Sequence, residues 1–380
     1  MATNKTDKVL NVPTLRFPGF TDEWEKMSIG SIASKVGSGS TPRGGSAIYE
    51  EKGRPFVRSQ NIGNGFLLLD DIVHISEEIH NQQKNTEIIE QDVMLNITGA
   101  SIGRCAIADT RIAGGNVNQH VCIIRSTSLN PIFLSNYILS HRGQKQIESF
   151  QAGGNREGLN FEQVRSIRLN VPQRKEQDKI SSLLTLLDER IALQSKLIDR
   201  LKSLMDGIID KVTALTPNIS IGECLDCYSS TLQECETEEQ GTYPVYGANG
   251  VCGYLDYATI SAPAILIVKD GSGVGNVSYA NGDCSVVGTL NYLQPKRDVS
   301  AKFLYFVLKR FNFQPYKTGM AIPHIYFKAY SKTRIFCPDY EEQTRMAASL
   351  SRIEDKIALE ERLLCLLQEQ KHYLLSAMFI

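Results

Sequence analysis

An internal repeat constrains the fold of this chain more than any other feature of its sequence. Residues 153–205 match a segment 166 positions further along, so that Gly153 falls on Gly319 (319 − 153 = 166) and Arg168 falls on Arg334. A repeat of this length indicates two tandem copies of one structural unit. The 380 residues also leave room for two domains of ordinary size.

Each copy ends in a segment with the pattern of a long helix. The segment opens with the motif P-x-x-x-E-Q, at Pro172 and again at Pro338, and apolar residues then recur at alternating steps of four and three. This spacing is typical of a coiled coil, although one long helix of an ordinary bundle can share it. We predict helical spacers over 172–215 and 338–380, each with a helix of about 33 residues and about 50 Å.

The two predicted helices share the positions of their apolar seams. Gln194 occupies the one polar position in the first seam, and Glu360 occupies the matching position in the second. The predicted seam residues are Ile180, Leu184, Leu187, Ile191, Ile198, Leu201, Met205 and Ile208 in the first helix and Met346, Leu350, Ile353, Ile357, Leu364, Leu367 and Leu374 in the second.

The segments upstream of the two helices mix strand and helix patterns. Apolar runs separated by glycine turns predict strands, and Asn130-Pro131 predicts the start of a helix. We therefore predict an α+β fold with two tandem bodies, over 22–171 and 216–337, and an N-terminal arm over 1–21.

Composition excludes several classes of protein. The chain has no apolar run of about 18 residues, so no membrane span or membrane partner is expected. Nine scattered cysteines indicate reduced thiols in the cytoplasm, and the Cys224/Cys227 pair has no second ligand pair that would indicate zinc. P-loop, H-E-x-x-H and G-x-S-x-G motifs are absent from the sequence, so an independent enzyme is disfavoured.

Charge is distributed unevenly along the chain. Taken alone, the total of 41 basic and 42 acidic residues argues against a nucleic-acid binder. However, residues 296–336 hold nine basic residues and one acid, 9 − 1 = +8, with aromatic residues between them, and residues 93–170 hold eight basic against four acidic residues. Two basic stretches at equivalent places predict two nucleic-acid-binding faces, although either alone has the composition of a solvated surface.

A glycine-rich segment in the second body resembles a cofactor loop. Gly271, Gly273 and Gly275 follow an apolar run as G-x-G-x-G, which would suit a nucleotide or S-adenosylmethionine. The equivalent place in the first body holds only Gly99 and Gly103. The shared G-x-x-x-G element favours a turn that both copies need.

Polar residues in the loops near these stretches are the candidates for DNA contact. Arg, Asn and Gln suit bidentate hydrogen bonds to base edges, although each such residue can also serve in a turn. In the first body the candidates are Ser40, Thr41, Arg43, Arg58, Gln60, Asn61, Arg104, Asn118, Gln119, His120, Asn155, Arg156 and Asn160. In the second body they are Tyr246, Asn249, Lys269, Ser272, Asn276, Lys302, Lys309, Arg310, Lys317, His324, Tyr326 and Lys332, of which Lys302, Lys309, Arg310 and Lys332 are predicted to contact phosphates.

These features together resemble the specificity subunit of type I restriction-modification systems (HsdS-like) over essentially the whole chain. The resemblance rests on LRFPGFTDEWE (15–25), YPVYGANGVCGY (243–254), the two G-x-x-x-G strand pairs and P-x-x-x-E-Q before both helices. Each motif alone is weak, but their duplicated order is specific.

The resemblance implies a division of labour. Each body would be a target-recognition domain that reads one half of a split, asymmetric DNA sequence, and the two helices would pack as an antiparallel coiled coil that sets the spacing. The helices would dock two modification subunits that carry S-adenosylmethionine, and restriction subunits with ATP and Mg would join them. This chain would carry no cofactor, no metal and no catalytic residue, and would work on double-stranded DNA in a bacterial cytoplasm.

Two alternatives remain open from the residues alone. A coiled-coil scaffold or adaptor without DNA binding would also need two long helices. A DNA methyltransferase with a degenerate cofactor loop would also carry Gly271, Gly273 and Gly275 after a strand.

Overall fold

The computed structural model describes residues 11–151, 158–319 and 322–380, and it divides the chain into two compact units. Unit 1 comprises residues up to Leu193 together with Leu364–Ile380, and unit 2 comprises Gln194–Leu363. Each unit therefore contains one body and parts of both long helices. No helix within these described ranges is long and apolar enough to cross a membrane.

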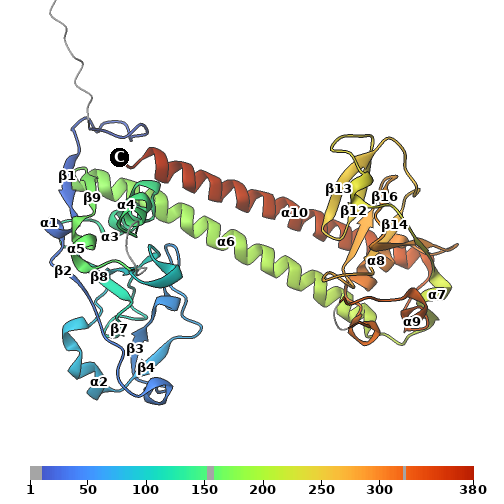
Figure 1. The fold of residues 1–380 in the computed structure, drawn as a ribbon, viewed down its shortest axis with the longest axis horizontal. Coiled ribbons are helices and arrows are strands. Elements are labelled where there is room, and N and C mark those ends of the chain that lie inside the picture. The colour runs from blue at the N-terminus through green and yellow to red at the C-terminus, as the bar shows by residue number, and fades with distance from the viewer. Residues whose placement is uncertain (1–10, 152–157, 320–321) are drawn as a thin grey trace, which may run out of the picture. The chain divides into compact units, whose positions relative to one another are not determined.

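The body of unit 1 contains three small sheets (Figure 1). The four-stranded sheet has the order β2 (Lys35–Ser38), β8 (Val121–Arg125), β5 (Val93–Asn96), β6 (Cys105–Ile107) and is antiparallel throughout. The three-stranded sheet has the order β4 (Val73–Ile75), β3 (Arg54–Val57), β7 (Asn116–Val117), and β1 (Glu25–Ser28) pairs with β9 (Arg168–Val171). Its helices are α1 (Ile29–Ile32), α2 (Glu77–Gln82), α3 (Pro131–Leu139), α4 (His141–Gln151) and α5 (Phe161–Ser166).

The body of unit 2 repeats this topology. Its four-stranded sheet has the order β11 (Leu225–Ser229), β17 (Leu290–Pro295), β14 (Ala264–Val268), β15 (Val277–Ala280). Its three-stranded sheet has the order β13 (Gly250–Leu255), β12 (Tyr243–Gly247), β16 (Ser285–Val286), and β10 (Ile219–Ser220) pairs with β18 (Arg334–Ile335). Its helices are α7 (Ile221–Cys224), α8 (Ala301–Lys309) and α9 (Phe327–Tyr330), so α2 and α4 have no counterpart among its described residues.

The predicted fold class is confirmed, and the repeat extends through both bodies. The central strands β5 and β14 are buried along their whole length, which explains why they read as unbroken apolar runs. Around them the core of unit 1 includes Met94 and Ile123, and the core of unit 2 includes Leu266 and Val286.

Both long helices exceed their predicted length. α6 runs over Arg174–Thr213 and α10 over Tyr340–Ala377, 40 and 38 residues against the predicted 33 or so. All fifteen predicted seam residues are buried or half-buried. The additional length comes from the polar first turns, which the apolar pattern did not include.

The two helices pack antiparallel in each unit. In unit 1 the carboxylate of Asp188 on α6 contacts the ammonium of Lys371 on α10 at 2.5 Å. In unit 2 the Gln194 amide donates to the backbone oxygen of Glu360 at 3.1 Å and also to its carboxylate. The polar side chains at these two equivalent seam positions are therefore hydrogen-bonded to each other. This pairing stabilises the seam, because a buried polar group without a partner is costly.

The structure explains the glutamine of the P-x-x-x-E-Q motif. The Gln177 side chain donates to the carbonyl of Pro172 and accepts from the backbone N–H of Asn130, both at 2.9 Å. Asn130 is the N-cap of α3, as predicted. In unit 2 the side chain of Gln343 does the same for Pro338 and for the N-cap of α8. Each glutamine thus ties a long helix to its body.

The C-terminal residues of the chain complete the body of unit 1. Phe379 is buried against Phe133 and Tyr137 of α3, with ring centroids 5.1 and 6.0 Å apart. The side chain of Asn170 donates to the carbonyl of Ile380 at 2.7 Å. Unit 1 is therefore built from both ends of the described chain.

Candidate nucleic-acid interface

Two loops of unit 2 pair through their backbones and bring several predicted residues together. The turn after β14 (269–276) and the segment before α9 (317–326) are joined by Gly271 N–H to Pro323 O at 3.0 Å and by Ile325 N–H to Lys269 O at 2.9 Å. We call these segments the unit 2 loop pair. They carry six predicted residues: Lys269, Ser272, Asn276, Lys317, His324 and Tyr326.

Unit 1 contains the equivalent loop pair. The turn after β5 (97–104) pairs with the segment before α5, where the backbone N–H of Leu159 donates to Ile97 O at 2.8 Å and Thr98 bridges to Gly158. Arg104 lies on this turn and is exposed. The predicted residues Asn155 and Arg156 belong to the same segment but lie outside the described residues.

The glycines of both turns serve backbone conformation. Gly99 and Gly103 have φ of 70° and 87°, and Gly271 and Gly275 have φ of 96° and 92°. L-residues rarely adopt this region, so glycine is needed at both ends of each turn. The amides of Gly271 and Gly275 donate to backbone carbonyls of the chain itself. They are therefore not free to cradle a phosphate, which favours the predicted turn over a cofactor loop.

A chain of hydrogen bonds orients Gln119 beside the unit 1 loop pair. Its side-chain oxygen accepts from the backbone N–H of Thr41 at 3.0 Å and from the Thr41 hydroxyl, and its amide nitrogen lies 3.0 Å from Nε2 of His120. Nδ1 of His120 contacts the hydroxyl of Thr98. If the amide donates to Nε2, one N–H of the exposed Gln119 remains for an outside acceptor, such as a base edge.

Asn249 and Tyr246 lie at the β12–β13 hairpin of unit 2. A hollow of about 550 Å³ is formed there by the hairpin turn and by the segments near Thr231 and Thr289. Asn249 is exposed on its rim, whereas Tyr246 is half-buried. Thr289 is linked to the unit 2 loop pair, because its carbonyl accepts from the backbone N–H of Lys269 at 2.9 Å.

Several predicted base contacts of unit 1 have structural roles instead. Asn61 is completely buried, and its amide donates to Leu68 O and to the Asp71 carboxylate. Asn118 is buried, and its side-chain oxygen accepts from the backbone N–H of His120 at 3.0 Å. Burial of both side chains disfavours contact with a base, so the structure supports a structural role for Asn61 and Asn118.

Three further candidates of unit 1 are exposed or half-buried but already bonded. Arg58 and Gln60 both contact the carboxylate of Asp71. Asn160 caps α5 by accepting from the backbone N–H of Gln163 at 2.8 Å. Ser40 and Arg43, in contrast, are exposed and stay predictions.

The predicted phosphate contacts Lys302, Lys309 and Arg310 all have acidic partners within the chain, which disfavours that role, and they stay predictions. Lys302 and Lys309 bind the carboxylate of Glu354 on α10, at 2.9 and 3.1 Å. Arg310 binds Asp210 at 2.8 Å near the end of α6. These cations fasten α8 to the long helices, and only the folded chain brings the distant acids next to them.

The same pairing neutralises much of the predicted basic face of unit 2. Lys296 contacts Asp226 at 3.4 Å, and Arg334 donates to the backbone oxygen of Asn218. Lys317, half-buried, and Lys328 and Lys332, both exposed, have no ion-pair partner among the described residues. Lys332 therefore stays a candidate for phosphate contact.

The long helices carry an exposed apolar face that the sequence analysis did not identify. Its members are Leu186, Leu193, Leu366 and Tyr373 in unit 1 and Leu197, Leu204 and Leu359 in unit 2, between 39% and 66% exposed. We call these residues the leucine face. Apolar residues seven positions apart along each helix could have predicted this face. The seam has more apolar residues at regular spacing, so its pattern was recognised instead.

The leucine face lies on one flank of the helix pair. Relative to the seam, the members of the face in each unit occupy the flank that antiparallel helices place on one common side. The opposite flank carries ion pairs: Lys202 contacts Glu361 at 2.7 Å, and Asp188 contacts Lys371. In each unit this ion pair thus lies on the flank opposite the exposed apolar residues.

Burial suppresses the ionisation of several thiols in the described part of the chain. No group of three or more His, Cys, Asp or Glu residues in the described ranges could hold a metal ion. A hydrogen bond with the Cys337 thiol, together with burial, raises the pKa of Cys224. Burial raises the pKa of Cys105 and Cys122 to about 12, so these thiols are neutral.

Comparison with known proteins identifies the family. A family model described as the type I restriction modification DNA specificity domain matches residues 21–203 and 221–369. A type I specificity subunit of Mycoplasma genitalium is 25% identical over 239 residues, which are 56% of this chain and 60% of that protein. The EcoprrI specificity subunit of Escherichia coli is 24% identical over 117 residues, 31% of this chain and 29% of that protein.

Solved structures agree on the fold. The crystal structure of the S subunit of the type I restriction-modification system of M. genitalium has a TM-score of 0.66 at 17% identity and covers 97% of this chain and 99% of that one. A chain from a study of assembly and conformational transition of the type I system has a TM-score of 0.54 at 16% identity and covers 95% of this chain and 97% of that one. The sequence matches span less than two thirds of the two curated relatives, but the family model covers both bodies. The chain therefore belongs to the family of type I restriction modification DNA specificity domains.

Proposed function

We propose that this chain is the DNA-recognition subunit of a type I restriction-modification complex. The main support for the proposal is that the whole body is duplicated, including the loop pair that exposes polar side chains. Each body reads one half of a bipartite, asymmetric target in double-stranded DNA. A single uninterrupted target would not need two different copies of one recognition unit.

The long helices separate the two readings and set their spacing. A helix of 40 residues extends about 60 Å at 1.5 Å per residue. This exceeds one turn of B-DNA, about 34 Å, so two bodies on such a helix pair can reach separate stretches of the groove.

The leucine face docks two modification subunits. An apolar stripe on an antiparallel helix pair suits helices of a partner, which would cover the exposed leucines as in a helical bundle. The repeat places Leu193 and Leu359, 166 residues apart, at equivalent positions on the face. Because the two recognition bodies are copies of one unit, the complex takes two copies of the partner, and restriction subunits join this assembly.

This chain is non-catalytic in the proposal. The partners supply S-adenosylmethionine, ATP and Mg, and the modification subunits methylate adenine. Methylation within a duplex requires the target base to be flipped out, so the recognition chain must hold distorted DNA through phosphates as well as bases.

The test is co-expression of the chain with the products of its neighbouring genes, followed by mapping of N6-methyladenine in the host DNA. We expect a split motif of two half-sequences separated by a fixed gap. Methylation at one continuous motif would contradict two-body reading. Binding of S-adenosylmethionine by the isolated chain would favour the methyltransferase alternative, and a complex without DNA binding would favour the scaffold.

A further inference from the structure

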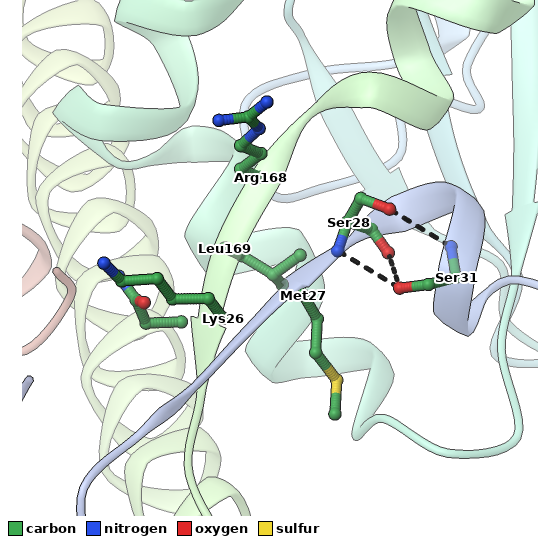
Figure 2. Close-up of a pocket in the computed structure, with 7 residues that line it drawn as sticks. Lys26, Met27, Ser28, Ser31, Arg168 and Leu169 are labelled. Carbon is green, nitrogen blue, oxygen red and sulfur yellow. Dashed lines mark hydrogen bonds between the residues drawn. The ribbon is translucent and has the colours of Figure 1, made fainter.

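Unit 1 contains a basic surface that the duplicated recognition loops do not explain. A hollow of about 600 Å³ lies beside the β1–β9 sheet and is lined by Lys26 and Arg168, among others (Figure 2). A second hollow, of about 430 Å³, shares Arg168 and adds Arg142 and Lys145 of α4. We call these four cations the β1–β9 patch.

The strand register places the cations of the sheet on one face. Lys26 lies directly opposite Asn170, and Ser28 lies directly opposite Arg168. Because side chains alternate along a strand, these four residues project to the same side. Asn170 also lines both hollows, so the two hollows are neighbours on this face of the sheet.

The patch keeps its positive charge, unlike the basic stretch of unit 2. Lys26, Lys145 and Arg168 are exposed and have no ion-pair partner among the described residues. None of the residues that line the two hollows in the described part of the chain is Asp or Glu. The adjacent Glu25 points to the other side of β1 and lines a separate hollow.

The remaining lining identifies the ligand class. It includes the hydroxyl and amide side chains of Ser28, Ser31, Gln146 and Ser149, together with the apolar Met27, Leu169 and Ile380. Arg and Lys together with Ser, Asn and Gln are the side chains that contact DNA phosphates. Protein interfaces instead have apolar cores with few charges, and none of the large exposed apolar residues of unit 1 lines either hollow.

The patch is also specific to unit 1. Arg334 is the counterpart of Arg168, but its guanidinium is bonded to the backbone of Asn218. Unit 2 has no described counterpart of α4, so it lacks the equivalents of Arg142 and Lys145. A feature required by the shared fold would occur in both units.

We propose that the β1–β9 patch binds the phosphate backbone of DNA outside the bases that unit 1 reads. This rests on the proposed function. Ser31, which lines the first hollow, and Thr41 beside Gln119 are ten residues apart, so they lie at most about 36 Å from each other. This distance is about one turn of the duplex, so one DNA molecule can contact both the β1–β9 patch and the unit 1 loop pair.

The experiment uses the full complex with its modification subunits and a triple variant, Lys26→Ala/Lys145→Ala/Arg168→Ala. The dissociation constant is measured at several salt concentrations for a duplex with the split target and for one without it. We expect the salt slope to fall by about three, one for each lost phosphate contact, and affinity to fall equally for both duplexes. The methylated sequence should be unchanged.

Two controls separate the local contact from bulk charge and from misfolding. Lys52→Ala/Lys84→Ala/Lys175→Ala removes three exposed cations elsewhere in unit 1 and should leave the slope unchanged. Lys26→Arg/Lys145→Arg/Arg168→Lys keeps the charges and should keep the wild-type slope. Both triple variants at the patch should melt within a few degrees of the wild type.

Three results would overturn the proposal. The slope of the triple alanine variant could equal that of the wild type. The control variant could also lower the salt slope as much as the triple alanine variant does, which would indicate an effect of total charge. Loss of a modification subunit with an unchanged slope would show that the patch binds an acidic protein surface. Failure of the proposed function is distinguishable, because the wild-type complex itself would then show no preference for a split target.

Discussion

Replacing Glu354 by glutamine should destabilise unit 2 through the attachment of α8 to α10. The Glu354 carboxylate accepts from the Tyr305 hydroxyl at 2.6 Å and from the ammonium groups of Lys302 and Lys309. Its side chain is 27% exposed. The ammonium of Lys302 also lies over the rings of Tyr279 and Tyr305, 4.4 and 4.6 Å from their centroids, so removing its counter-charge leaves a half-buried cation.

The magnitude follows from these three contacts. A hydrogen bond to a charged group contributes roughly 1 kcal/mol more than a neutral one. Three such contacts, reduced for partial exposure, give a loss of about 2–3 kcal/mol. For a unit of 170 residues (363 − 194 + 1), this corresponds to a fall in Tm of roughly 5–10 °C.

The assay is thermal unfolding followed by circular dichroism at neutral pH, with Glu361→Gln as the matched control. Glu361 lies on the same helix and makes one exposed ion pair with Lys202, so its loss should cost less than about 1 kcal/mol. Equal effects of the two substitutions would refute the reasoning. So would a Lys302→Ala/Lys309→Ala variant that lowers the salt slope of DNA binding without lowering Tm.

The pH dependence gives a second check on the same residue. Burial alone would raise the pKa of Glu354, but the hydrogen bonds from Tyr305, Lys302 and Lys309 outweigh it and hold the pKa below its usual value. A carboxyl with a lowered pKa stabilises the fold above its unfolded pKa, about 4.3, and loses that contribution as pH falls through the folded pKa. The difference in stability between wild type and Glu354→Gln should therefore shrink below about pH 4.

Three further predictions concern the helices and the bodies. Gln194→Leu alone should destabilise unit 2 by about 1–3 kcal/mol in thermal unfolding, because it leaves the buried Glu360 carboxylate without this partner. The double variant Gln194→Leu/Glu360→Leu should restore or exceed wild-type stability. A double variant that is less stable than the single variant would contradict this. Inserting a few residues within 178–210 should lengthen the gap between the methylated half-sequences and leave both halves unchanged, as read by methylation mapping; a changed half-sequence would rule out the spacer role. Exchanging residues 22–170 for those of another member of the family should change one half-sequence only, and a change in both would argue against modular reading.

The elements that the sequence predicted well are those with a local or repeated signal. The seam of the long helices follows from spacing alone, and the start of α3 follows from the capping preference of Asn130 and the fixed φ of Pro131. The turn at Gly271 and Gly275 could be told from a cofactor loop because the repeat offered Gly99 and Gly103 for comparison. The order of motifs also led to the correct family.

The candidate interface was predicted less well because its residues depend on distant neighbours. Asn61 and Gln119 are both amides in polar loops, yet Asn61 is buried by its bonds to Asp71 and Leu68 while Gln119 is exposed. Lys302 and Lys332 belong to one basic stretch, yet only Lys302 meets an acid, and that acid lies 52 residues further along the chain. A side chain's burial and partner are set by tertiary contacts that residue type does not record.

The sequence by itself determined the duplicated architecture, the two long helices and the family, because periodicity, capping and repetition are properties of neighbouring or aligned residues. Only the tertiary structure decided which charges remain available to a ligand. In unit 2 the acids of both long helices pair with Lys302, Lys309 and Arg310 of the basic stretch, whereas the β1–β9 patch of unit 1 has no ion-pair partner among its described surroundings. The physical reason is that an ion pair forms between groups a few ångströms apart in space, whatever their separation along the chain.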